Sequence, residues 1–378
     1  MKILHIGKYF APFKGGIENM MLALIKAQTS AGLNVSVLVH HHKTGSAYSE
    51  TKEFGANIYR LPIVAKLLFV PIALSALWYL KRILKQTPPD VIHAHLPNAT
   101  CFWLLFLPTT NKSKLILHWH SDVIGERPNL GIKLLYPFYR IFEIRLLRKA
   151  HSIIVTSENY LHSSEPLKLF LDKCEVIPLG LENYALDIKK ESQFEVGALC
   201  VGRLTYYKGH EFLIRAFSIL KHETLPLTIV GDGEERAKLK QIVNELGLQN
   251  RVRFLGQVDD ATLNALIANC DFLVLPSIER TEAFGLVLLE AMRASKACVC
   301  TDVAGSGMSN VVQHEETGLV VSHSDAEALA QAIDYLATNP RANNEFGIQG
   351  RKRFLKQYQV QCVEEQVRAI YARKGVVI

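Results

Sequence analysis

Two glutamates eight positions apart, Glu282 and Glu290, enclose the stretch of sequence most suited to binding a polar ligand. An apolar, strand-like run ends at Pro276, a polar loop follows, and the residues from Phe284 onward favour a helix with Gly285 in its first turn. The start of a helix offers unpaired N–H groups and a positive dipole end to an anion, and Glu290 would lie about two turns further along. The stretch therefore suits a ligand with hydroxyl groups at both ends and phosphate between them, which is the shape of a nucleotide-sugar.

Two cations, Arg203 and Lys208, stand in the segment GRLTYYKG at 202–209, directly after another strand-like run. Cations and glycines at the carboxyl end of a strand can clamp a diphosphate. Taken alone, however, the segment is better explained by solvated surface charges. The GDG sequence at 231–233 resembles a dinucleotide loop, but Arg236 replaces the third glycine of G-x-G-x-x-G.

Histidines mark the ends of two further strand-like runs. His120 precedes Ser121 and Asp122, and a carboxylate near a histidine can hold its tautomer while the ring accepts a hydrogen bond from a substrate. His93 and His95 share one face of a predicted strand, but no third metal ligand is evident nearby. We therefore predict no metal site.

The composition indicates a globular chain, since 49% of its 378 residues are hydrophobic and 21% are charged. The length favours two domains. A net charge of +7 suits a polyphosphate ligand or an anionic membrane surface, whereas the lack of a lysine/arginine block disfavours nucleic acid as a partner. Seven scattered cysteines without a CxxC pair, and an N-terminal stretch unlike a signal peptide, favour a cytoplasmic protein.

The order of elements predicts two α/β units. A strand at 2–6, a loop with Gly15 and Gly16, a helix at about 18–31 and a strand at 35–40 begin a parallel sheet, whose ligands are expected beyond the carboxyl ends of the strands. The two glycines form either a simple tight turn or a place where a substrate approaches the backbone closely.

A polar, aperiodic segment at 181–197 predicts the interdomain linker, a second α/β unit starts at 198, and 360–373 reads as an amphipathic helix. The apolar and basic segments 64–86 and 132–150 are predicted to be helices that either pack on the core or lie on a membrane surface.

Together and in this order, these motifs resemble the retaining glycosyltransferases of the GT4 family. The resemblance covers essentially the whole chain, and it rests on seven motifs: the glycine loop at 15–16, DVIHAH, HSD at 120–122, IPLG at 177–180, GRLTYYKG, GDG and the E-x7-E motif at 282–290. The HSD, PLG and GSG loops are most similar to bacterial polysaccharide mannosyltransferases. One departure is Leu179, which replaces an asparagine common in the PxG turn.

The resemblance implies the GT-B fold, an α/β architecture of two facing Rossmann-like domains with a cleft between them. Residues 1–180 would form the acceptor-binding domain, and 358–378 would return to it through a final helix that crosses back. Residues 181–357 would form the donor-binding domain.

The resemblance also implies roles for individual residues. Arg203 and Lys208 would neutralise the diphosphate leaving group, Glu282 would contact sugar hydroxyls and Glu290 would hold the ribose. His120 would hydrogen-bond the sugar from the other domain. The N–H groups of Phe284, Gly285 and Leu286 would lie near the sugar or phosphate, and Gly16 would let the acceptor side approach the β-phosphate. Ala283 is the remaining implied donor-binding residue.

The implied activity is retaining transfer of a hexose, with mannose as one candidate, from a nucleoside-diphosphate sugar to a lipid-linked glycan or polysaccharide. The resemblance implies that no metal or other cofactor is required, and that the protein acts in the cytoplasm, with attachment to the inner face of the cell membrane left open. Two alternatives are an NAD-dependent oxidoreductase built on one Rossmann half and a non-catalytic sugar- or lipid-binding protein.

Overall fold

The computed structural model describes residues 1–13, 15–67, 70–107, 113–123, 130–184 and 195–376. The chain divides into two compact units: unit 1 comprises Met1–Glu182 with Val360–Ile378, and unit 2 comprises Asn183–Gln359. The domain boundaries predicted after residues 180 and 357 lie within two residues of this division. Most of the predicted linker, 185–194, lies outside the described residues.

Unit 1 is built on an eight-stranded sheet. Its strands are β1 (Lys2–Ile6), β2 (Asn34–His40), β3 (Ser49–Glu53), β4 (Ala56–Leu61), β7 (Val91–Leu96), β8 (Lys114–Trp119), β9 (Ser152–Val155) and β10 (Cys174–Val176). They lie in the order β10-β9-β8-β7-β1-β2-β4-β3, and every neighbouring pair is parallel except β3 and β4. The order reverses between β1 and β7, so the loops after these two strands meet at the point where open α/β sheets bind ligands.

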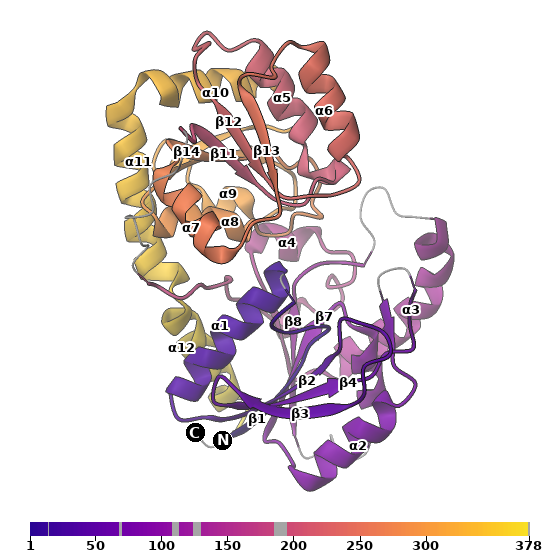
Figure 1. Ribbon diagram of the computed structural model, residues 1–378. Coiled ribbons are helices and arrows are strands. Elements are labelled where there is room, and N and C mark those ends of the chain that lie inside the picture. The colour runs from indigo at the N-terminus through magenta and orange to yellow at the C-terminus, as the bar shows by residue number, and fades with distance from the viewer. Residues whose placement is uncertain (14, 68–69, 108–112, 124–129, 185–194, 377–378) are drawn as a thin grey trace. The chain divides into compact units, whose positions relative to one another are not determined.

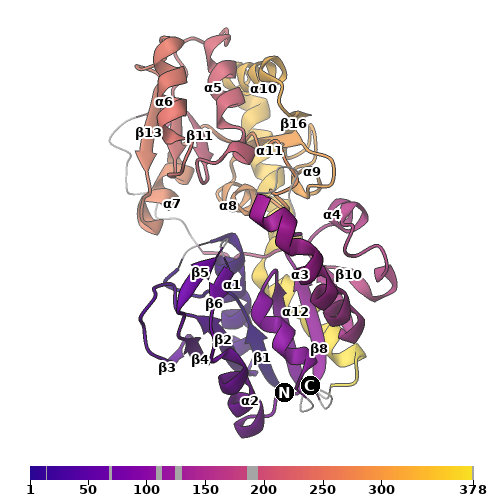
Figure 2. The ribbon, with the colours of Figure 1, turned by 90° about the vertical axis from the view of Figure 1, so that its right-hand side faces the viewer.

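Helices cover both faces of this sheet. They are α1 (Gly16–Ser30), α2 (Ala76–Gln86), α3 (Leu130–Lys149), α4 (Glu158–Ser163) and α12 (Val360–Arg373), with short 3₁₀ segments η1 (Ala99–Leu105) and η3 (Leu171–Lys173). The helices α1 and α12 lie side by side on one face, and α2 and α3 lie on the other (Figures 1 and 2). The bounds predicted for the last helix, 360–373, are confirmed. Among the described residues, no helix has both the length and the apolar character needed to cross a membrane.

The segment 64–86 was predicted to be helical, but its first half is not. It forms a two-stranded antiparallel hairpin of β5 (Ala65–Leu67) and β6 (Val70–Ile72), and only α2 is a helix. Pro71 lies in β6, and a proline inside a helix removes a hydrogen bond and clashes with the preceding turn. The apolar pattern alone did not distinguish a helix from a β-hairpin in this segment.

Unit 2 has a fully parallel, six-stranded sheet. Its strands are β11 (Ala198–Val201), β12 (Leu227–Val230), β13 (Val252–Gly256), β14 (Phe272–Leu275), β15 (Ala297–Asp302) and β16 (Gly318–Ser322). They lie in the order β13-β12-β11-β14-β15-β16. The strand order reverses between β11 and β14, so the loops after these strands, which carry GRLTYYKG and the first glutamate of E-x7-E, lie at one edge of the sheet.

The helices of unit 2 are α5 (His210–Ser218), α6 (Arg236–Glu245), α7 (Asp260–Asn269), α8 (Leu286–Arg293), α9 (Met308–Val311), α10 (Ala326–Thr338) and α11 (Pro340–Arg353), with the 3₁₀ turn η4 (Tyr206–Lys208) and the π-helical turn η5 (Phe354–Tyr358). An apolar core joins α5, α6, α10 and α11 to the sheet. The core is continuous through β11, β12, β14 and β15, and it therefore fixes the strand ends from which the candidate site is built.

Candidate active site

Lys208 and Glu282 form an ion pair at the carboxyl edge of the unit 2 sheet. The two side chains come from the loops after β11 and β14, and each is only 13% exposed. Burial acts to lower the pKa of Lys208, but the nearby Glu282 outweighs it together with Tyr207, so the pKa lies above its ordinary value. The lysine is therefore a fixed cation at the site.

Two glycines, Gly202 and Gly209, fix the position of Lys208 by letting other groups pack closely on their backbone. Gly209 has a left-handed φ of +68°, and a Cβ there would overlap the carbonyl oxygen of Pro276. The two loops are joined next to this contact, where the N–H of Ile278 donates to the carbonyl oxygen of Tyr207 at 2.8 Å. A Cβ at Gly202 would lie 3.3 Å from Nζ of Lys208, so the lysine side chain lies directly on the backbone.

The GDG sequence supports the same loop and has a packing role. A Cβ at Gly231 would overlap the carbonyl oxygen of Gly202, and a Cβ at Gly233 would overlap that of Leu204. The N–H of Leu204 donates to the carbonyl oxygen of Asp232 at 3.1 Å. Both glycines are therefore needed for backbone to pack on backbone behind the cationic loop.

The backbone of the Glu282 segment is held by the loop GSG at 305–307, which follows β15. The Ser306 hydroxyl donates to the carbonyl oxygen of Glu282, and the N–H of Gly307 donates to that of Ala283 at 2.8 Å. Ser306 is fully buried. A role for Ser306 was not predicted, although a serine between two glycines shortly after a strand was a signal for one.

The helix after Glu282 begins later than predicted. Gly285 is not in the first turn, because its left-handed φ of +82° is incompatible with an α-helix, and α8 starts at Leu286. Glu290 therefore lies about one turn into α8, or roughly 6 Å beyond its start at 1.5 Å per residue, and not two turns. Phe284 is buried and its ring packs edge-on against Tyr358, so its side chain belongs to the core.

Glu290 is half-buried, and burial raises its pKa, with Arg293 opposing and Asp260 adding to this shift. Arg203 is exposed at the end of β11, and within the described residues it forms no ion pair with Glu282. Of the predicted donor-binding residues, the structure thus joins Lys208 to Glu282 directly and leaves Arg203 open to solvent.

In unit 1, Gly16 is the first residue of α1, and a Cβ there would meet no atom within 4 Å. The backbone at the start of this helix is consequently uncovered within unit 1. This geometry agrees with close approach by a ligand and gives no packing reason for the glycine.

His120 directly follows β8 and is 4% exposed. Its Nε2 lies 3.0 Å from Nδ1 of His95, and burial lowers its pKa to about 3, so the ring is neutral. The prediction that Asp122 orients this ring is wrong. Asp122 accepts from Trp119 Nε1 at 2.9 Å and from the Ser164 hydroxyl at 2.7 Å, because β8 ends at Trp119 and the chain then turns toward α4.

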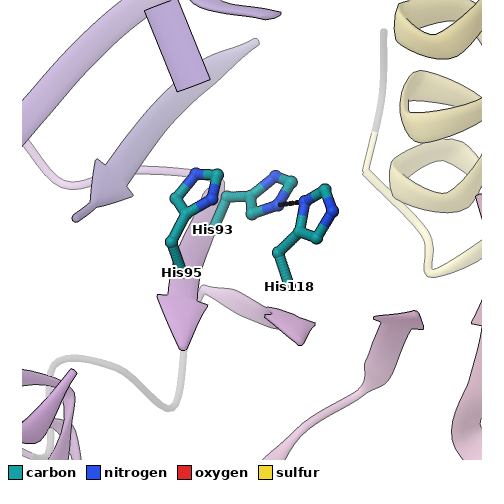
Figure 3. A group of neighbouring side chains, drawn as sticks. All are labelled: His93, His95 and His118. Atoms are coloured by element: carbon teal, nitrogen blue, oxygen red, sulfur yellow. Dashed lines mark hydrogen bonds between the residues drawn. The ribbon is translucent and has the colours of Figure 1, made fainter. Parts of the chain in front are cut away.

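The expectation that His93 and His95 have no third potential metal ligand nearby is wrong, because His118 lies beside them. His95 lies opposite His118 in the register of β7 and β8, and one ring nitrogen from each of the three histidines lies within 4.8 Å of the others (Figure 3). All three rings are buried. Spacing along the chain could not reveal this cluster, because it forms across neighbouring strands.

Two family models match the chain, each along one unit. The glycosyl transferase 4-like domain matches residues 15–180, and the glycosyl transferases group 1 match residues 188–353. The O-antigen chain mannosyltransferase C of Escherichia coli is 31% identical over 370 residues, covering 94% of this chain and 93% of that protein. The chain is a glycosyltransferase of the GT4 type.

Other relatives agree with this assignment. The D-rhamnosyltransferase WbpZ of Pseudomonas aeruginosa is 31% identical to this glycosyltransferase, over 94% of this chain and 91% of that protein. Sucrose-phosphate synthase of Thermosynechococcus elongatus superimposes with a TM-score of 0.79 at 23% identity, covering 98% of both chains. HepE of Anabaena, solved with UDP, has a TM-score of 0.75 at 19% identity, covering 99% of this chain and 100% of that one. The predicted GT-B fold class is confirmed.

The first unit of the glycosyltransferase contains a cavity of about 390 Å³. Its apolar wall comes mainly from α3 and β6, and it includes Ile132, Leu135, Tyr139 and Ile72. Polar groups reach it from Lys8, Asn98 and Asp122. This cavity was not predictable from sequence patterns, since its lining comes from five separate segments of the chain.

Proposed function

We propose that this glycosyltransferase moves a hexose from a nucleoside-diphosphate sugar to a lipid-linked glycan or polysaccharide, with retention of configuration and without a metal. The Lys208–Glu282 ion pair carries the proposal. Its two members come from loops that meet at the ligand-binding edge of the unit 2 sheet, and both are largely shielded from water.

The chemistry follows from the charge of the pair. As the bond between the sugar and the diphosphate breaks, negative charge grows on the leaving phosphate, and a preorganised cation in a shielded site stabilises that charge strongly. Lys208 supplies it, and the exposed Arg203 adds a planar, bidentate donor that suits phosphate oxygens. A carboxylate oxygen of Glu282 beside the lysine is an acceptor for sugar hydroxyls.

The relatives support the choice of a hexose, because two of them at 31% identity are named for mannosyl and D-rhamnosyl transfer. Retention is proposed from the resemblance to the retaining enzymes of the GT4 family. A covalent intermediate is not part of the proposal, because the motifs place no carboxylate besides Glu282 as a nucleophile, and Glu282 is engaged by Lys208. We infer front-face attack assisted by the departing phosphate.

The anomeric configuration of the product tests this proposal. An α-linked nucleotide-sugar and an oligosaccharide primer are incubated with the protein, and the one-bond ¹³C–¹H coupling at the anomeric carbon of the product is measured by NMR. We expect an α-linked product. A β-linked product would contradict retention, and binding without any product would favour the non-catalytic sugar-binding alternative.

We further propose that the protein docks on an anionic membrane through α3. Exposed apolar side chains recur along this helix at Leu130, Leu134, Phe138 and Ile141, and the exposed bases Lys133, Arg145 and Arg148 accompany them. This combination is typical of a helix that lies in a membrane interface. The opposite side of the same helix lines the cavity of unit 1, so a lipid-linked acceptor could reach the cavity from the bilayer.

Replacing Leu134 by aspartate is expected to reduce sedimentation with phosphatidylglycerol vesicles by about tenfold at low salt. The substitution puts a charge in place of an apolar side chain whose burial in the bilayer contributes roughly 1.5–3 kcal/mol to binding. The matched control is Leu169→Asp, since Leu169 is 71% exposed and Leu134 is 72% exposed. Equal loss of binding in both variants, or no loss in either, would contradict docking through α3.

A further inference from the structure

Five buried histidines lie on one face of the unit 1 sheet, and they come from β1, β7 and the end of β8. They are His5, His93, His95, His118 and His120. The register explains their proximity, since His5 pairs with His93 and His95 pairs with His118. Neighbouring rings are stacked, with centroids 4.2–5.4 Å apart. Burial lowers the pKa of every ring, to about 4 for His5 and about 3 for His120, so all are neutral.

A neutral imidazole has one N–H and one bare nitrogen, so each hydrogen bond in a chain of such rings fixes the next. The orientation of the Gln28 amide on α1 sets the direction of the first chain. With Oε1 toward Nε2 of His5, 2.7 Å away, this oxygen accepts from the His5 ring. Nδ1 of His5 is then bare and accepts from Nε2 of His95 at 3.0 Å. Nδ1 of His95 in turn accepts from Nε2 of His120 at 3.0 Å, which leaves Nδ1 of His120 bare.

A second chain starts from the other end of the same amide. Nε2 of Gln28 donates to the Tyr371 hydroxyl at 3.3 Å, and this hydroxyl donates to Nδ1 of His93. Nε2 of His93 then donates to Nδ1 of His118 at 3.2 Å (Figure 3). One amide therefore polarises both chains, and Tyr371 on α12 ties the second to the C-terminal helix.

We propose that Gln28, His5 and His95 hold His120 in the Nε2–H tautomer, so that its bare Nδ1 can only accept a hydrogen bond, from a hydroxyl of the bound sugar substrate. Within the described residues, Nδ1 of His120 is buried and has no hydrogen-bond partner. His120 stands at the carboxyl end of β8, the edge of the sheet where ligands bind. The choice of a sugar as ligand rests on the proposed function, whereas the tautomer does not.

The alternative use of this cluster is a metal site, and its geometry does not fit one. Tetrahedral ligands at 2.0–2.1 Å from zinc lie about 3.4 Å apart. The candidate nitrogens of His93, His95 and His118 span up to 4.8 Å, and both nitrogens of His95 are engaged by His5 and His120. A metal would have to break the chain that reaches His120.

The tautomer can be measured directly. Long-range ¹H–¹⁵N spectra of the full chain with ¹⁵N-labelled histidine report the protonated nitrogen of each ring, and the His120→Gln variant assigns the His120 signals. We expect the Nε2–H tautomer for His120 in the substrate-free wild-type protein. The Nδ1–H tautomer, a mixture of the two, or a change of the spectrum on adding one equivalent of zinc would overturn the proposal.

Breaking the chain tests its role in positioning. His95→Phe keeps a stacked ring but removes both nitrogens, and we expect a mixture of His120 tautomers together with about a tenfold fall in kcat/KM, corresponding to about 1.4 kcal/mol. His118→Phe is the matched control, because it cuts only the second chain and should leave the His120 tautomer unchanged. An unchanged tautomer in His95→Phe would overturn the proposal. Since the spectra need no substrate, a failure of the proposed sugar transfer would leave them unaffected.

Discussion

Replacing Lys208 by alanine is expected to lower turnover by about 10²- to 10³-fold, as the loss of one preorganised group that stabilises developing charge does in other enzymes. The lysine is 13% exposed and paired with Glu282, so water cannot readily take over its role. Donor consumption measured at saturating donor separates this effect from a loss of binding.

The control for this variant is Lys238→Ala. Lys238 is a lysine of the same unit that also forms ion pairs, with Glu211 at 2.8 Å and Glu235 at 3.2 Å, but it lies on the exposed surface of α6. Its removal should change turnover by less than about twofold, because surface ion pairs contribute little. Equal losses in the two variants would show that the effect is structural, and unchanged turnover in Lys208→Ala would remove the lysine from the mechanism.

Replacing Gly209 by alanine is expected to destabilise unit 2 by about 3 kcal/mol or more. The left-handed φ of +68° alone costs about 1 kcal/mol for a residue with a Cβ, and the overlap with the carbonyl oxygen of Pro276 adds the rest. The loop must then move away from β14, which separates Lys208 from Glu282. We expect a fall in Tm of roughly 6–12 °C, at 2–4 °C per kcal/mol for a domain of this size.

The control variant Gly247→Ala separates the cost of the left-handed φ from the cost of the steric overlap. Gly247 has nearly the same φ, +69°, but a Cβ there would meet no atom within 4 Å. Its substitution should cost only about 1 kcal/mol and leave turnover intact. Similar thermal shifts in both variants would contradict a steric role for Gly209.

The sequence predicted the parts of the site that depend on order along the chain. Strand ends, glycine loops and the E-x7-E spacing, combined with the family resemblance, made Lys208 and Glu282 candidates, and the structure pairs them because β11 and β14 are neighbours at the reversal of strand order. The amphipathic pattern of 360–373 gave the bounds of α12, because no proline or glycine interrupts it.

The features that were missed depend on contacts between distant segments. The start of α8 is set by the left-handed φ of Gly285, where a Cβ would lie 2.9 Å from side-chain atoms of both Leu275 and Leu288. The partner of His120 is His95 on the neighbouring strand, which sequence proximity to Asp122 obscured. Ser306 supports Glu282 from a loop 24 positions away. None of these contacts follows from hydrophobic periodicity, and the local sequence marks only Ser306, as a serine between two glycines after a strand.

The central claim is that Lys208 and Glu282 grip a nucleoside-diphosphate sugar for metal-free transfer. Its most direct test is slow donor cleavage without acceptor, with GDP-, UDP- and ADP-sugars offered in the presence of EDTA to wild-type protein and Lys208→Ala. We predict that wild-type protein cleaves one class of donor and that Lys208→Ala cleaves it at least about 10²-fold more slowly. Cleavage at equal rates by both proteins, or cleavage that EDTA abolishes, would contradict the claim.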